Sequence, residues 1–315
     1  MFGVEAHLEK GTATLKKLAT TTKNDFDFSN ETKLMYGILL FHTSDNKEQA
    51  LQFFQQQKFP SEENLIGNIA AINLMLHSNK NDKANELLKK IPASKDYPKV
   101  ALVEYLKGLQ QLQILNIKVG ANHLRNYLLQ TKSKHFIKSS YQKIAWCSLI
   151  NNDFSSYKKN IVEINKSGKA TREADKQALK AFEAGETPNI FLLKSRLLFD
   201  AGNYNGALEV LNEIENSKTS VAFETEIVYR KARIYDKLND KKNAVALYLA
   251  TINKGEKLHY YYAANAALHL GYIYEQQGDK KKATLYFEKC ISLQNHEYAN
   301  SLTQKAKSAL KRMNQ

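Results

Sequence analysis

The sequence contains few prolines, glycines and cysteines and no long apolar run, and these absences argue against folds other than an all-helical one. Its 315 residues include only 4 prolines and 13 glycines, whereas an all-β chain needs a turn signal about every 8 to 12 residues. The only cysteines, Cys147 and Cys290, lie far apart within apolar helical patterns, so neither a disulfide framework nor a zinc site is predicted. No apolar run approaches the ~18 residues of a membrane span. We therefore expect an all-helical chain without a membrane span.

The N-terminus, MFGVEAHLEK, lacks the basic start, the apolar stretch and the small-residue cleavage site of a secretory signal. As the sequence stands, we expect a cytoplasmic protein. If Met1 is not the natural start, a signal further upstream would place the protein in the periplasm or the cell envelope.

Positive charge is in excess, with 46 lysines and arginines against 32 acidic residues. Nearly all of it is lysine, because only six arginines occur: Arg125, Arg172, Arg196, Arg230, Arg233 and Arg312. Specific recognition of bases and phosphates relies on the forked guanidinium group, whereas dispersed lysines mostly solvate a surface. Lysine-driven binding of nucleic acid or another polyanion is therefore an alternative function, and nucleic acid is not the favoured partner.

The chain repeats a helix-hairpin pattern at spacings of 34 to 39 residues. Residues 231–254 and 270–293 share an aromatic, a small and a second aromatic position, and residues 195–214 form a third copy. The matching pairs are Tyr235 with Tyr274, Ala244 with Ala283, and Tyr248 with Phe287, and Ala207 holds the small position of the third copy. Gly202, Asn239 and Gly278 occupy the expected turns.

These residues resemble the tetratricopeptide repeat, a two-helix hairpin with small residues where its helices meet. The last copy matches best, at Leu270, Gly271, Tyr274, Gly278, Ala283, Phe287 and Cys290. A small residue lets the two helices approach closely, and the aromatic residues fill the space between neighbouring hairpins. Because one hairpin cannot bury its own apolar face, several must stack.

Four further hairpins are expected towards the N-terminus, which gives about seven in a right-handed α-solenoid. They are marked by Ala50 with Phe54, by Ala84 with Leu88, by residues 105–129 and by residues 139–161. In the last of these, Tyr157 stands where the repeat has alanine, so we expect an offset packing of its two helices.

The spacing is broken once, between Asn152 and Gly202. Residues 168–188 predict an additional helix there, with Thr171 as its N-cap. We interpret residues 1–165 as an array of degenerate repeats, residues 166–187 as an extra helix or joint, and residues 188–315 as repeats closed by a capping helix. A hinge at the joint and a continuous superhelix are both compatible with the sequence.

In order and spacing, residues 100–315 are also similar to a family of uncharacterised bacterial tetratricopeptide-repeat proteins. That resemblance implies no reaction. The chain has no glycine-rich phosphate loop, nucleophile elbow or zinc-protease motif, and none of its eight histidines has another three or four residues away. We predict no catalytic residue, no cofactor and no metal, and hence not an enzyme.

The resemblance implies a concave binding groove lined by the first helix of each hairpin. It assigns to that groove Trp146, Arg196, Phe199, Tyr229, Arg233, Asn265 and Tyr272, together with Lys237, Leu268 and Gln276. Aromatic residues beside arginines are the types that dominate interface energetics, although aromatics at helical spacing are also typical of a core. We predict a non-catalytic scaffold that holds a protein or peptide partner in this groove.

Overall fold

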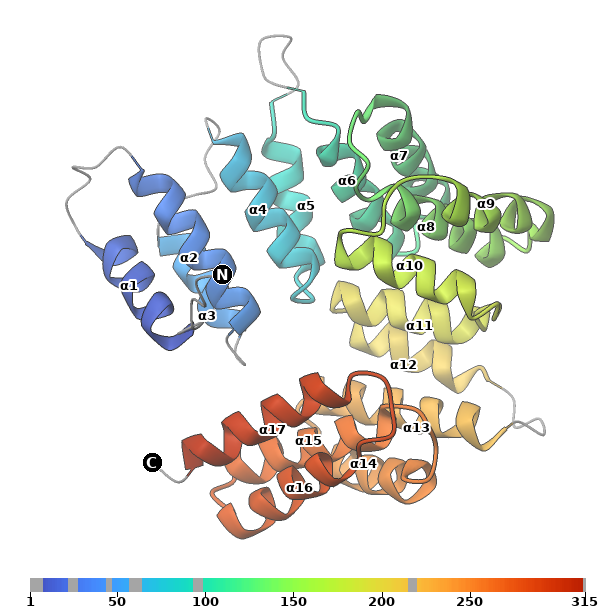
Figure 1. Ribbon diagram of the computed structural model, residues 1–315. Coiled ribbons are helices and arrows are strands. Elements are labelled where there is room, and N and C mark those ends of the chain that lie inside the picture. The colour runs from blue at the N-terminus through green and yellow to red at the C-terminus, as the bar shows by residue number, and fades with distance from the viewer. Residues whose placement is uncertain are drawn as a thin grey trace, which may run out of the picture. The chain divides into compact units, whose positions relative to one another are not determined.

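The computed structural model describes residues 8–21, 28–43, 47–56, 64–92, 99–214 and 220–313, and within these ranges all regular secondary structure is α-helical (Figure 1). The chain divides into an N-terminal unit, Met1–Ile190 with Asp200–Gly202, and a C-terminal unit, Phe191–Phe199 with Asn203–Gln315. No helix in these ranges is long and apolar enough to cross a membrane.

The N-terminal unit holds ten helices within its described residues. They are α1 (Leu8–Thr20), α2 (Ser29–Thr43), α3 (Lys47–Gln56), α4 (Leu65–Leu76), α5 (Asn81–Lys90), α6 (Leu102–Gln113), α7 (Ile117–Gln130), α8 (Ile137–Ile150), α9 (Phe154–Lys166) and α10 (Glu173–Glu183). The four expected hairpins are confirmed as α2–α3, α4–α5, α6–α7 and α8–α9, each a pair of helices in direct contact.

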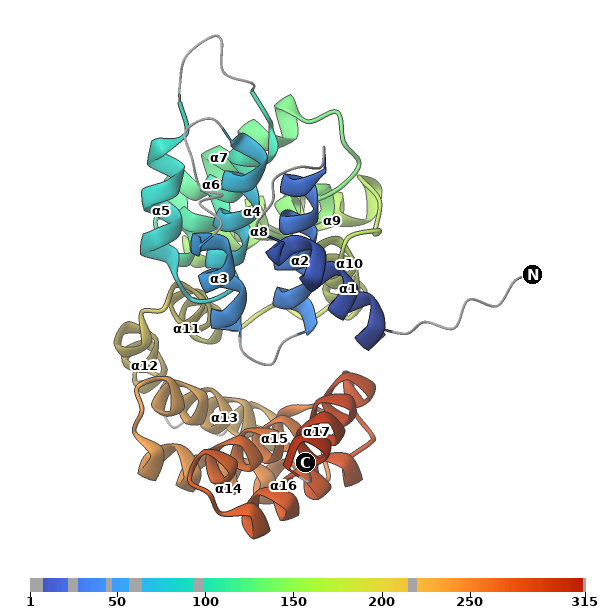
Figure 2. The ribbon, with the colours of Figure 1, turned by 90° about the vertical axis from the view of Figure 1, so that its left-hand side faces the viewer.

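The C-terminal unit is built in the same way from the remaining helices. They are α11 (Ile190–Ala201), α12 (Tyr204–Asn212), α13 (Val221–Lys237), α14 (Lys241–Gly255), α15 (Tyr262–Gln276), α16 (Lys280–Ser292) and α17 (Ala299–Met313). Figure 2 shows α12 to α17 following one another side by side, and each contacts the next. The hairpins α11–α12, α13–α14 and α15–α16 bring the total in the described residues to the seven that the sequence predicts.

Four of the hairpin turns share one local arrangement. Asn152, Gly202, Asn239 and Gly278 have φ values of 59°, 88°, 62° and 77°, a left-handed conformation that glycine and asparagine tolerate best. The next residue in each turn is Asp or Asn, and its side chain accepts a hydrogen bond from a backbone N–H in the first turn of the following helix. This N-cap satisfies a donor that has no partner within the helix.

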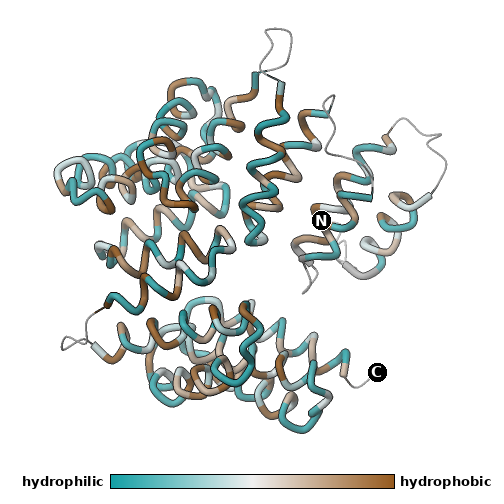
Figure 3. The backbone as a smooth tube through the Cα atoms, turned by 180° about the vertical axis from the view of Figure 1, so that it is seen from behind, coloured by the Kyte–Doolittle hydropathy of each residue, from teal (hydrophilic) through white to brown (hydrophobic). Residues whose placement is uncertain are grey.

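Small residues allow the two helices of a hairpin to approach closely. Ala244 and Ala283 are fully buried, as are the aromatic residues Tyr248 and Phe287. A Cβ atom at Gly271 would lie 2.4 Å from Cε1 of Phe287, so only glycine fits beside that ring. In Figure 3 apolar and polar stretches alternate along the helices, as expected for helices with one buried side.

Helix α10 is the additional helix that the sequence predicts, and it packs on α8 and α9. The expected N-cap at Thr171 is wrong. Arg172 holds the cap position without a side-chain capping bond, since a guanidinium has no acceptor. The hydroxyl of Thr171 pairs instead with Nδ1 of His135 at 2.8 Å. A first-turn side chain of α10, the buried Asp175, caps α8 by accepting hydrogen bonds from the backbone N–H groups of Phe136 and Ser139.

Candidate partner-binding groove

The first helices of the three C-terminal hairpins, α11, α13 and α15, provide the surface on which most of the sequence-predicted site residues lie. We call this surface the first-helix face. Residues 226, 229, 233 and 237 share one side of α13 because they are three or four positions apart. The corresponding residues of α15 are Asn265, Leu268 and Tyr272.

Arg233 contacts two aromatic rings of this face. Its guanidinium carbon lies 4.4 Å from the ring centroid of Phe199 and 5.9 Å from that of Tyr229. Both rings are buried, so they support the guanidinium from below. A cation held over an aromatic face is attracted by the negative charge density of the ring, and here that attraction joins α13 to α11.

The other predicted site residues differ in how accessible they are. Arg196 is exposed, and Asn265 and Tyr272 are half-buried. The ring of Tyr272 packs edge-on against Phe287, with 5.4 Å between centroids. Trp146 is buried in the N-terminal unit, where Nζ of Lys143 lies 5.4 Å from the ring centroid. The structure thus brings Phe199, Tyr229 and Arg233 together, and it places Trp146 in the other unit.

Sequence reasoning missed a polar cluster around Asp236, one turn beyond Arg233. One carboxylate oxygen lies 2.6 Å from Nζ of Lys241. The other lies 3.6 Å from Nδ1 of His269 and accepts a 3.4 Å hydrogen bond from the hydroxyl of Tyr248. The rings of Tyr248 and His269 are stacked. These contacts join α13 to α14 and α15. No local sequence signal predicts them, because Lys241, Tyr248 and His269 all lie on other helices than Asp236 does.

The two titratable partners of this cluster have displaced pKa values. Burial raises the pKa of the Asp236 carboxyl, but the hydrogen bonds and charges of His269 and Lys241 outweigh burial and hold that pKa at about 2. Burial lowers the pKa of His269, and the hydrogen bond to Asp236 opposes this only in part. The imidazole is therefore neutral and the carboxylate charged at neutral pH.

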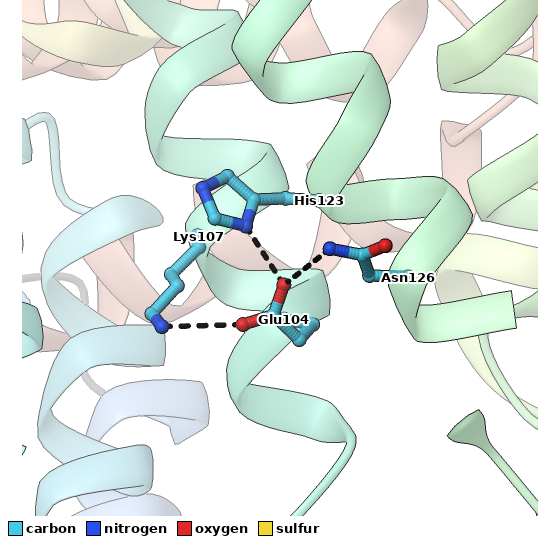
Figure 4. A network of polar contacts seen from close by, with 4 residues as sticks. All are labelled: Glu104, Lys107, His123 and Asn126. Carbon is cyan, nitrogen blue, oxygen red and sulfur yellow. Dashed lines mark hydrogen bonds and ion pairs between the residues drawn. The ribbon is translucent and has the colours of Figure 1, made fainter. Parts of the chain in front are cut away.

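A second polar cluster lies in the N-terminal unit, between α6 and α7 (Figure 4). The carboxylate of Glu104 lies 2.8 Å from Nδ1 of His123 and 3.1 Å from Nζ of Lys107, and it accepts a longer hydrogen bond from Asn126. Burial raises the pKa of Glu104, but these donors outweigh it and lower the pKa. Glu104 thus forms an ion pair with Lys107 on its own helix and polar contacts with His123 and Asn126 on α7.

Metal-ligating residue types do not cluster in the part of the chain that the structure describes: no group of three or more His, Cys, Asp or Glu side chains there could hold a metal ion. Both cysteines are buried free thiols, and burial raises the pKa of Cys147 to about 12 and that of Cys290 to about 11. Neither thiol is therefore an activated nucleophile.

Comparison with family models matches the tetratricopeptide repeat at residues 225–252 and 264–297. These two segments correspond to the hairpins α13–α14 and α15–α16. The resemblance that the sequence predicts is confirmed for these hairpins. A search of curated proteins finds no match.

Solved structures similar to this chain include three from different sources. The first is from the APC/C hetero-tetramer Cut9-Hcn1, with a TM-score of 0.39 and 11% identity, covering 95% of this chain and 59% of that one. The second is the C-terminal part of a tetratricopeptide-repeat protein from Cytophaga hutchinsonii, with a TM-score of 0.31, 13% identity and coverage of 85% and 98%. The third is a tetratricopeptide-repeat protein from Parabacteroides merdae, with a TM-score of 0.32, 13% identity and coverage of 94% and 99%.

Proposed function

We propose that this chain, whose C-terminal unit contains tetratricopeptide repeats, is a non-catalytic scaffold that binds a protein or peptide segment on the first-helix face. The observation that carries the proposal is the position of Arg233 over the rings of Phe199 and Tyr229. Stacked repeats expose the first helices of consecutive hairpins along one surface, and such a surface suits an elongated partner.

The residues of the first-helix face differ in burial, so that buried residues form its floor and accessible residues can contact a partner. Phe199 and Tyr229 are buried and form the floor, whereas Arg196, Arg233, Asn265 and Tyr272 retain accessible surface from which to meet a partner. Arginine and tyrosine are enriched among the residues that carry most interface energy. A guanidinium that already rests on a ring loses less conformational entropy when a partner binds.

The contacts and pKa values of two carboxylates, Asp236 and Glu104, support a non-catalytic role. Asp236 and Glu104, whose carboxyl pKa values are lowered, each form polar contacts that join two helices. A general acid or base at neutral pH needs a pKa near the working pH, and these carboxylates are displaced in the opposite direction.

Affinity capture from a nuclease-treated lysate of the source cells, at low and high salt, tests the proposal. The test variant is Arg196→Ala, Arg233→Ala, Tyr272→Ala. A matched control, Lys242→Ala, Lys281→Ala, Leu285→Ala, removes two cations and one apolar side chain from exposed positions of α14 and α16. Circular dichroism first establishes that both variants are folded.

The proposal predicts a protein that wild type and the control retain at high salt and that the test variant loses. Capture that disappears with nuclease or with salt in all three proteins contradicts it. That result would favour the polyanion alternative, because binding through released counterions falls steeply between about 50 and 200 mM salt.

A further inference from the structure

We propose that the partner segment of the first-helix face is proline-rich and binds as a polyproline II helix. A proline ring of the partner contacts Tyr261 and Tyr298, and a backbone carbonyl accepts a hydrogen bond from the side-chain amide of Asn265. This inference rests on the proposed function and adds the chemistry of the partner. It is carried by a cluster of tyrosines, by an accessible amide beside them and by the lack of charge on α15.

Five tyrosines gather where α15 begins, and we call them the tyrosine cluster. They are Tyr229 of α13, Tyr260, Tyr261 and Tyr262 around the start of α15, and Tyr298 directly before α17. Figure 2 shows these three helices side by side. Tyr229 lies in the buried floor of the first-helix face, and its ring centroid is 5.8 Å from that of Tyr261 and 5.3 Å from that of Tyr262. The tyrosine cluster therefore continues this face towards the start of α15.

Two rings of the tyrosine cluster form a corner that suits a proline. The rings of Tyr261 and Tyr298 lie 5.3 Å apart between centroids and at 90° to each other, so a compact ring in the corner contacts both. Tyr298 is 44% exposed, and Tyr260, whose ring stacks on that of Tyr262, is 42% exposed. Proline-rich segments bind to surfaces lined by aromatic rings, and they lose little conformational entropy because they are already extended.

The backbone of Tyr298 supports a role for its ring. Its φ of 68° is a left-handed conformation that bulky residues rarely adopt. Glycine or asparagine would adopt it at lower cost, so the ring and not the backbone accounts for a tyrosine at this position. Residues held in such conformations gather at binding sites.

The polar groups beside the corner can donate hydrogen bonds to a partner. Asn265 lies one helical turn after Tyr261, and its backbone N–H donates to the Tyr261 carbonyl. Within the described residues, neither the half-buried side-chain amide of Asn265 nor the hydroxyls of Tyr260 and Tyr261 form a hydrogen bond. A polyproline II segment has no internal hydrogen bonds, and its prolines offer carbonyls but no N–H. Donors on the chain thus match acceptors on the partner.

The charge pattern favours an uncharged protein segment. No Asp, Glu, Lys or Arg occurs from Tyr260 to Tyr274. On α13, Nε of Arg230 donates to the carboxylate of Glu226 at 2.8 Å, so this pair adds no net charge. A single strand of nucleic acid can also stack on aromatic rings, but residues 260–274 offer its phosphates no lysine or arginine. A proline-rich segment needs no such cation.

Fluorescence anisotropy with the full chain tests the inference. The probes are three labelled ten-residue peptides with blocked ends: ten prolines, alternating glycine and serine, and a helix-forming peptide of alanine, glutamine and leucine. We expect the proline peptide to bind wild type more tightly than the other two do. Asn265→Ala should weaken this binding by ~5-fold through the lost hydrogen bond. Tyr298→Asn should weaken it by ~10-fold or more through the lost ring, and asparagine tolerates the left-handed backbone.

The matched control is Gln277→Ala, which removes an exposed amide from the other end of α15. It should leave binding of the proline peptide within about twofold of wild type. Circular dichroism first establishes that the variants are folded.

The outcomes separate this inference from the proposed function. A proline peptide that binds no more tightly than the other two, or that binds either Asn265→Ala or Tyr298→Asn as tightly as wild type, overturns the inference. Both results leave the scaffold function standing, because they concern only the chemistry of the partner. The scaffold function fails separately, if the lysate yields no protein that wild type retains at high salt.

Discussion

The guanidinium of Arg233 on α13 lies 4.4 Å from the ring centroid of Phe199 on α11. This contact joins the first helices of two consecutive hairpins and fixes a positive charge on the face that they share. It links the packing of the C-terminal unit to its proposed function, because a ring that fills the interior also contacts the side chain that we propose as a partner contact.

The contact should be measurable as a coupling energy. In a double-mutant cycle with Arg233→Met and Phe199→Leu, the free energies of unfolding should deviate from additivity by about 0.5–1 kcal/mol, the usual strength of a partly exposed cation–π pair. Urea unfolding of the four proteins gives this number. Strict additivity would mean that the guanidinium gains nothing from the ring.

Gly271 should tolerate no side chain. A Cβ atom there would lie 2.4 and 2.5 Å from two carbons of the Phe287 ring, so Gly271→Ala should lower the free energy of unfolding by about 1–3 kcal/mol through overpacking. Gly11→Ala in α1 is the matched control, because no atom lies within 4 Å of its added Cβ. Combining Gly271→Ala with Phe287→Leu should cost less than the sum of the two changes. A neutral Gly271→Ala would contradict the close packing of α15 on α16.

Asp236 should make the C-terminal unit sensitive to acid. Its folded pKa of about 2 lies below its ordinary value of 3.8, so its stabilisation is complete above about pH 4 and is lost as the pH falls through about 2. The displacement corresponds to about 2 kcal/mol. Asp236→Asn should therefore be less stable than wild type at pH 6, and the difference should shrink towards pH 2. Urea unfolding across this range measures it, and a difference independent of pH would contradict the assignment.

Asp175 should be the residue that holds α10 onto α8. Its carboxylate accepts hydrogen bonds from the N–H groups of Phe136 and Ser139, at 2.6 and 3.0 Å. Asp175→Ala leaves these donors without that acceptor, at an expected cost of about 1–3 kcal/mol. The exposed first-turn neighbour Glu173 serves as control, and Glu173→Ala should change stability by less than about 0.5 kcal/mol. Equal effects of the two changes on thermal unfolding would argue against a capping role.

The sequence predicts the repeating parts of this fold because they depend on local chemistry. Gly202, Asn239 and Gly278 stand in the turns where a left-handed residue is needed, and Ala244 and Ala283 stand where helices touch. Each of these residues can be assigned from its own hairpin. The same local patterns predict the extra helix but not its cap, because the contact of Thr171 with His135 spans 36 residues.

The contacts that define the candidate site depend on how hairpins stack, and the periodicity of one helix does not specify them. Asp236 and His269 lie on consecutive first helices, and Arg312 reaches Glu275 from the terminal helix. Likewise, their positions in the repeat predict Phe199 and Tyr229 in the groove, yet both residues are buried. A small rotation of a helix determines whether a side chain is buried or accessible to a partner, and sequence spacing does not fix that rotation.

Site-directed photocrosslinking tests the central claim most directly. A benzoylphenylalanine replaces Asn265 on the first-helix face in one protein and the exposed Leu285 of α16 in another, and both are irradiated with the captured partner. The account predicts a crosslink from position 265 that is lost on adding Arg233→Gln, and none from position 285. A crosslink from position 285 alone would show that the partner binds the second helices, and it would contradict the first-helix face as the binding surface.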